Sequence, residues 1–148
     1  MVVLFLCSSI GFGQLPNWLG TGGSYSGASP HWGGWGAIAL PISQGQQIYS
    51  YSGYEATAHR HTVPTVSTTT GLATVLRSFT RDKTGLYILM LATAGEATSS
   101  SATTASFSGG GMALFRFKSG FTLELIVTAD KSASPTVPNF KLGSGWAW

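Results

Sequence analysis

Hydrophobic and polar residues alternate with a period of two along the last third of the chain. Between positions 104 and 118, Phe107, Ala113, Phe115 and Phe117 share one phase, whereas Arg116 belongs to the other. Successive side chains of a β-strand point to opposite faces. The pattern therefore predicts a strand with one apolar face and one more polar face.

The same alternation continues to the end of the chain. Between positions 120 and 130, Leu123, Leu125 and Val127 oppose Glu124. Between positions 139 and 148, apolar and aromatic residues again occupy every second position, opposite Lys141. Three consecutive strands are thus predicted, each with its apolar side chains on one face.

Turn-forming residues divide the chain from position 14 onward into eight strand-like segments, and no amphipathic helix is indicated. Most segments have about 9–12 residues, which is the length a tilted strand needs to cross a bilayer. The facing of the third to fifth segments is left open, because apolar residues occupy both phases there. The predicted segments are Leu19–Gly27, Gly34–Ser43, Gln47–Ala58, Thr68–Phe79, Gly85–Glu96, Thr104–Lys118, Gly120–Asp130 and Asn139–Trp148.

The connections between these segments are predicted to alternate in length. Short turns are expected at Gln44–Gln46, Thr80–Thr84 and Ser119, and longer connections at Ala28–Gly33, His59–Ser67, Ala97–Thr103 and Lys131–Pro138. Outer-membrane barrels have short periplasmic turns and longer outer loops. With both termini in the periplasm, the alternation has the phase expected for an even number of strands.

Composition favours a membrane barrel over a water-soluble domain. Only 9% of residues are charged, and the apolar residues are spread over alternate positions rather than gathered into a run long enough for a spanning helix. The formal charge is +3 and the basic residues are scattered, with their densest group at Arg77, Arg81 and Lys83. This spacing does not indicate a nucleic-acid-binding surface.

The segment Met1–Gly13 is predicted to be an export signal, and residues 14–148 a single β-barrel domain. An apolar run precedes the small residues Gly11 and Gly13, which suit a cleavage site before Gln14. The basic amino-terminal part of such a signal is missing, so we expect the true start to lie upstream. Cys7 is the only cysteine, so removal of the signal leaves a chain without thiols or disulfides.

Together, the eight segments and the terminal strand Phe140-Lys141-Leu142-Gly143-Ser144-Gly145-Trp146-Ala147-Trp148 make the chain resemble the small eight-stranded bacterial outer-membrane β-barrels. This resemblance implies an antiparallel up-and-down transmembrane barrel in the cell outer membrane. It also implies that the terminal strand, with Phe140, Leu142, Trp146 and Trp148, is recognised by the barrel-assembly machinery. The expected partners are outer-membrane lipid, that machinery and a surface ligand bound through the outer loops.

Four charged residues are expected in the barrel interior: Arg116, Glu124 and Lys141, with Arg77 as an addition. An isolated buried ion is costly, so these groups are expected to pair. A proton or ion path is one interpretation. A salt-bridge network that fills the interior is the favoured one, because eight strands enclose little more than their own side chains.

Other chemistry has little support in the sequence. His59 and His61 are weak metal-ligand candidates, with Glu55 and His31 as further donors, but a solvated polar loop is the favoured interpretation because no metal-binding spacing is present. A lipid-modifying enzyme at the outer rim, using Ser52, Glu55 and one of these histidines, is an alternative without a nucleophile motif. No cofactor or catalytic residue is predicted.

A soluble secreted β-sandwich is the first alternative to the membrane barrel, ahead of the rim enzyme. It would bind carbohydrate or another surface ligand on exposed Trp and Tyr rings. The membrane interpretation instead places the tryptophans at the lipid interface, near the strand ends. They are Trp18, Trp32, Trp35, Trp146 and Trp148.

The alternation makes a sharp prediction about facing. Arg116, Glu124 and Lys141 should point inward, because a slip of one residue would reverse every side chain of a strand. A structure with Arg116 or Glu124 on the same face as its apolar neighbours would contradict this. The residues expected on one outward band are Phe115, Phe117, Leu123, Leu125, Val127 and Leu142.

Overall fold

A computed structural model of the chain contains eight β-strands in the residues that it describes. These are residues 15–26, 31–43, 45, 47–59, 62–99, 101–131 and 136–148. The predicted export signal and His61 therefore lie outside the described residues. The strands are β1 Trp18–Ser26, β2 His31–Pro41, β3 Ile48–His59, β4 Thr62–Arg81, β5 Thr84–Thr98, β6 Thr103–Arg116, β7 Phe121–Lys131 and β8 Val137–Ala147.

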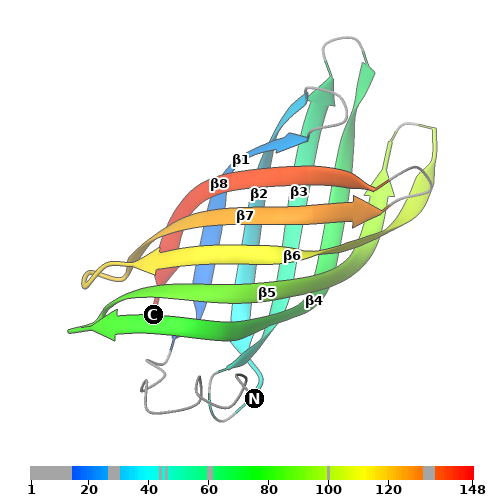
Figure 1. The fold of residues 1–148 in the computed structure, drawn as a ribbon. Helices are drawn as coiled ribbons and strands as arrows, with labels where there is room; N and C mark the ends of the chain where they lie inside the picture. The colour runs from blue at the N-terminus through cyan, green and yellow to red at the C-terminus, as the bar shows by residue number, and fades with distance from the viewer. Residues whose placement is uncertain are drawn as a thin grey trace, which may run out of the picture.

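Each strand pairs antiparallel with its neighbour in the chain, and β8 pairs with β1, which closes the sheet into a barrel (Figure 1). The closing ladder runs without a break from Trp18 opposite Ala147 to Ser26 opposite Asn139. The backbone amide of Trp148 extends it by donating to the Asn17 carbonyl at 3.0 Å. The predicted eight-stranded up-and-down barrel is confirmed, and the alternative of a two-sheet β-sandwich is ruled out.

The strands reach further into the predicted connections than the sequence indicated. β4 begins at Thr62 and contains 20 residues, so it takes up much of the long loop expected at His59–Ser67. Thr and Val favour extended backbone, and the ladder with β3 continues through this segment. The predicted alternation of short and long connections is therefore wrong as a statement about loop length.

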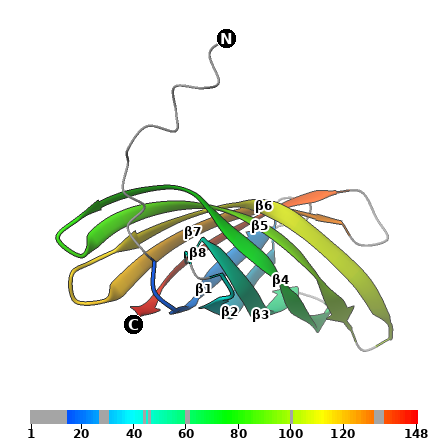
Figure 2. The same cartoon turned by 90° about the horizontal axis from the view of Figure 1, so that it is seen from below.

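The carboxyl terminus lies at the end of the barrel that carries the turns after β2, β4 and β6 (Figure 1). We call it the turn end, and the opposite one the outer end. The β4–β5 and β6–β7 hairpins reach far out at the turn end in both views (Figures 1 and 2). At the tip of the β4–β5 hairpin, Asp82 and Lys83 have φ values of 48° and 67°. Asp tolerates this left-handed backbone better than most residues do.

Inward and outward side chains alternate as predicted in the last three strands. Thr122, Glu124, Ile126 and Thr128 are all buried, while the outward residues of β7 between them are exposed. The outward band proposed from the sequence is confirmed, with Leu142 67% exposed. In β5, where the sequence left the facing open, Tyr87, Leu89 and Leu91 point inward.

Two predictions about individual side chains are corrected. The β4–β5 register shifts between Val75 and Arg77, so two successive residues, Leu76 and Arg77, are both exposed. This bulge turns Arg77 out of the interior. Trp18 and Trp35 are buried inside the barrel, at 0% and 2% exposure, and do not lie at an outer interface.

Aromatic and aliphatic side chains fill the turn-end half of the interior. The rings of Trp18 and Tyr49 meet edge to face with centroids 4.9 Å apart, and the Tyr49 hydroxyl donates to the Leu15 carbonyl. Leu89, Leu114 and other buried residues complete this core. In the described part of the chain, no helix is long and apolar enough to cross a membrane.

The closing seam generates the first prediction, because β1 and β8 approach closely at Gly145. A Cβ atom there would lie 1.8 Å from the Leu19 carbonyl oxygen. We expect Gly145→Val to destabilise the barrel by at least about 1–3 kcal/mol through overpacking. The neighbouring outward change Ser144→Val should stay within about 0.5 kcal/mol. Urea unfolding in detergent measures both, and equal effects would contradict the seam geometry.

Candidate functional site

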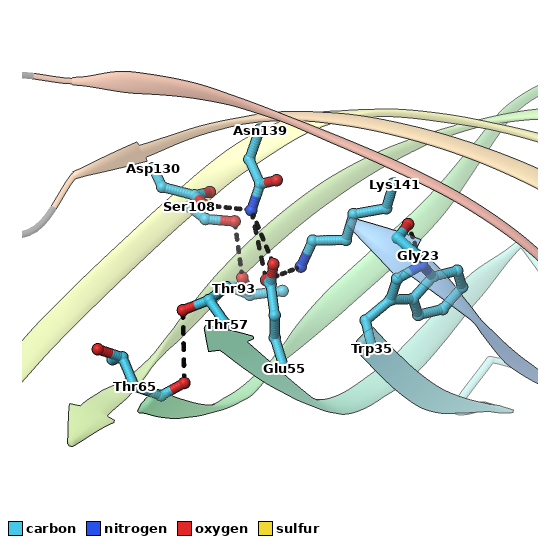
Figure 3. Close-up of polar contacts among 10 residues, drawn as sticks. All are labelled: Gly23, Trp35, Glu55, Thr57, Thr65, Thr93, Ser108, Asp130, Asn139 and Lys141. Carbon is cyan, nitrogen blue, oxygen red and sulfur yellow. Dashed lines mark hydrogen bonds and ion pairs between the residues drawn. The ribbon is translucent and has the colours of Figure 1, made fainter. Parts of the chain in front are cut away.

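The outer half of the barrel interior is polar, unlike the half near the turns. Inward positions of β3, β7 and β8 place four residues, Glu55, Asp130, Asn139 and Lys141, around one space (Figure 3). Asn139 and Lys141 are two residues apart, so both lie on the inner face of β8. We call these four residues the outer plug.

A short ion pair connects opposite sides of the outer plug. The Lys141 ammonium nitrogen lies 2.6 Å from Glu55 Oε2, and both side chains are largely buried, at 15% and 9% exposure. The Asn139 amide nitrogen donates to both Glu55 oxygens at 3.3 Å and to Asp130 Oδ2 at 3.1 Å. Strands far apart in the sequence are thereby joined across the interior.

Smaller polar contacts line the same half of the interior. The Thr93 and Ser108 hydroxyls lie 3.1 Å apart, and the Trp35 indole nitrogen donates to the Gly23 carbonyl at 3.1 Å (Figure 3). A buried ion pair offsets its desolvation only when further hydrogen bonds satisfy the remaining oxygens. The outer plug meets this condition at Glu55 and fills the space through which a pore would have to run.

Glu124 is held differently. Its Oε1 accepts a hydrogen bond from the Thr122 hydroxyl at 3.0 Å, whereas Oε2 is buried and has no hydrogen-bond partner among the described residues. Gly20 and Gly145 make room for it, since a Cβ atom on either would lie within 3 Å of the carboxylate. No ion pair involving Glu124 is found in the described part of the chain.

The expected single network of Arg116, Glu124 and Lys141 is therefore not formed. Glu124 lies opposite Gly143 in the ladder, whereas Lys141 lies opposite Ile126, one inward step further along. Long side chains can reach across such a diagonal offset of roughly 7 Å, but the Lys141 ammonium extends across the interior to Glu55 instead. Arg116 is partly buried near Tyr87, and its Nε has no hydrogen-bond partner among the described residues. Lys141 pairs instead with Glu55.

Sequence reasoning missed the partner of Lys141 because it lies on a distant strand. Glu55 was considered only as a metal or enzyme residue. Its position does carry a signal, since it falls in the same phase as Tyr49 and Tyr51, which are both buried. Placing these tyrosines inward would have placed Glu55 inward as well.

The rim-enzyme arrangement is contradicted by the facing of β3. Ser52 is exposed on the outer wall, whereas Glu55 points inward and is bound by Lys141. The two side chains lie on opposite sides of the sheet. His59 ends β3, but its side chain, like all of His61, is outside the described part. Within the described ranges, no three His, Cys, Asp or Glu residues gather into a group that could hold a metal.

The terminal strand presents an apolar outer face. Phe140, Leu142 and Trp146 are all exposed on the outside of β8, and Trp148 is 53% exposed. Its other face carries Asn139 and Lys141 of the outer plug. Recognition of this strand by an assembly machinery stays a prediction.

The closed wall, its apolar outer face and its filled interior define an eight-stranded β-barrel of the kind found in outer membranes. Among solved structures, the chain is similar to Ail, the attachment invasion locus protein of Yersinia pestis. The Ail crystal structure matches with a TM-score of 0.57 and 15% identity over 92% of this chain and 100% of that chain.

Two further structures of Ail match equally well. The backbone structure of this outer membrane protein in a phospholipid bilayer nanodisc gives a TM-score of 0.58 and 14% identity over 91% of this chain and 100% of that chain. The crystal structure of Ail with the heparin analogue sucrose octasulfate gives 0.58 and 15% over 92% and 100%. No protein-family model and no curated protein matches the chain. The shared feature is the fold.

Glu55 and Glu124 offer a matched pair for testing the site. Glu55→Gln leaves the buried Lys141 ammonium without a carboxylate, and we expect a loss of about 3–5 kcal/mol in unfolding free energy. Glu124→Gln leaves no cation unpaired, so its effect should stay within about 1 kcal/mol. Urea unfolding in detergent compares the two. A larger loss for Glu124→Gln would mean that the ion pair is assigned to the wrong carboxylate.

Proposed function

We propose that the chain is a small outer-membrane β-barrel of structural or surface-interaction type, with an interior filled by side chains. The single observation that carries this proposal is that the outer wall is apolar while charged and polar side chains lie inside, the reverse of a water-soluble protein. The outer wall is lined by exposed Leu, Ile, Val, Phe and Trp side chains, while Glu55, Glu124 and Asn139 are buried inside. In water such a wall would be an aggregation surface, whereas lipid solvates it.

Aromatic side chains near both ends of the outer wall support insertion in lipid. Phe115, Phe117 and Phe121 form a chain of ring contacts near the turn end, with centroids 4.8 and 5.7 Å apart. At the outer end, Tyr25 and Trp32 lie 5.2 Å apart. Barrels of this class carry an apolar band about 25 Å tall between two aromatic girdles. The arrangement supports a span, and the turn end, which carries the carboxyl terminus, is the end that we assign to the periplasm.

The outer plug argues against a general diffusion pore, which needs roughly twice as many strands. What remains available for interaction is the outer end. There β4, β5 and β6 continue as a wall rich in Thr, Ser and Ala, with Phe107 61% exposed on it. Ail, which is described as an attachment invasion locus protein, supports the choice of a surface-interaction role over an enzymatic one.

The remaining partners follow from this placement. Lipid covers the wall, and the terminal strand through Trp148 is the element that we assign to recognition by the barrel-assembly machinery. Residues 1–13 are assigned to an export signal that delivers the chain to the periplasm. A surface ligand is assigned to the outer end.

The proposal predicts the sidedness of two exposed serines, Ser101 after β5 and Ser119 after β6. In a Cys7→Ser background, Ser101→Cys should react with a membrane-impermeant maleimide on intact cells. Ser119→Cys should react only after the outer membrane is permeabilised, because it lies at the turn end. Labelling of both on intact cells, or the reverse pattern, would contradict the proposed span and orientation.

A further inference from the structure

The turn end of the outer wall carries a groove that the proposed function does not use. It has a volume of about 570 Å³ and is lined by residues of β4, β5 and β6, among them Phe79, Arg81, Thr84, Leu86 and Phe115. Phe79 lies opposite Leu86 in the ladder, and Leu86 lies opposite Phe115. These three side chains therefore form one apolar row across three strands.

Basic side chains gather around this row. Arg81 lines the groove directly, and the Arg77 guanidinium lies over the Phe79 ring, 4.8 Å from its centroid. Lys83 is exposed in the adjoining turn, and Lys118 is exposed in the neighbouring one. Long basic side chains on an apolar wall keep their stems on it and extend their charges toward the polar boundary.

Acidic residues do little to neutralise this group. Asp82 is the carboxylate next to Arg81, with Oδ2 at 3.8 Å from the arginine Nε. Both side chains are almost fully exposed, at 94% and 86%. An exposed pair at such a distance contributes little, so the positive charge stays available to a ligand.

Among the described residues, the last part of β4 is also unpaired on the side of β3. The ladder between β3 and β4 ends with Ile48 opposite Thr74, followed by the Val75 amide, which donates to the Gln47 carbonyl. From Leu76 to Arg81, β4 has no strand partner on that side among the described residues. Charged residues commonly protect such an edge from pairing with another strand. Here the same charges border an apolar groove.

We propose that this groove binds an anionic phospholipid of the inner leaflet, with its phosphate at Arg77 and Arg81 and an acyl chain along Phe79, Leu86 and Phe115. The inference rests on the proposed membrane insertion. Two features of the groove match the two parts of such a lipid. The apolar row suits an acyl chain, and the cations next to it, at the level where headgroups begin, suit the phosphate. Basic residues at a membrane boundary favour anionic lipids over zwitterionic ones.

The test measures which lipids the folded full chain retains. The protein is refolded in detergent micelles that contain equal amounts of phosphatidylglycerol and phosphatidylcholine, and native mass spectrometry counts the lipids that stay bound. We expect phosphatidylglycerol to be preferred. Replacing Arg77 and Arg81 with Gln should lower its retention about fivefold for each arginine. Lys131→Gln, an exposed lysine on the far part of the wall, should leave retention unchanged.

A second variant separates the groove from diffuse charge. Leu86→Trp fills the apolar row without changing any charge, and it should also lower phosphatidylglycerol retention. Equal retention of both lipids, an equal loss in Lys131→Gln, or undiminished retention in Leu86→Trp would each overturn the inference. Heat-modifiable migration shows in each case that the barrel has folded. Failure of the unaltered chain to fold with any lipid would instead count against the proposed function.

Discussion

Closure of the sheet by β1 and β8 is the constraint on which the rest of the structure depends. Lipid offers no hydrogen-bonding partner, so every backbone N–H and C=O in the span must be satisfied by a neighbouring strand. The unbroken ladder from Trp18 and Ala147 to Ser26 and Asn139 meets this need at the seam. An unpaired edge would leave groups that cost several kcal/mol each in hydrocarbon.

Closure of only eight strands then determines what the interior can hold. Trp18, Tyr49 and their apolar neighbours fill one half, and the outer plug fills the other. The ion pair from Glu55 to Lys141 joins β3 to β8, which are five strand positions apart around the barrel in one direction and three in the other. Glycines such as Gly20 and Gly145 provide the room for Glu124 beside the seam. The interior side chains therefore connect opposite walls of the barrel, and only the outer surfaces are available for interaction with other molecules.

The sequence predicts this fold well wherever the alternation is unbroken. In β7 every second residue from Thr122 to Thr128 is buried, and the facing follows from the period alone. Prediction failed at the bulge in β4, where one extra residue turned Arg77 outward without any change of composition to announce it. It also failed on loop length, because a Thr-rich segment is as compatible with a strand as with a loop.

The pairing inside the barrel was beyond sequence reasoning for a different reason. Alternation predicts which side chains point inward, but not the level at which each one lies. Glu124 and Lys141 share the interior on neighbouring strands, yet Lys141 pairs with Glu55 on the opposite wall. The contact between Asn139 and Glu55 spans 84 positions in the chain. Such a contact depends on the register of every intervening strand pair.

The central claim, that the apolar wall faces lipid while the interior is sealed from it, is tested most directly by fluorescence quenching. Two single-tryptophan variants are needed, with the other four tryptophans replaced by Phe. One keeps Trp146, which is 49% exposed on the outer wall, and the other keeps Trp35, which is 2% exposed inside. In vesicles of lipids with brominated acyl chains, the structure predicts strong quenching of Trp146 and little quenching of Trp35. Equal quenching of the two, or quenching of Trp35 alone, would contradict it.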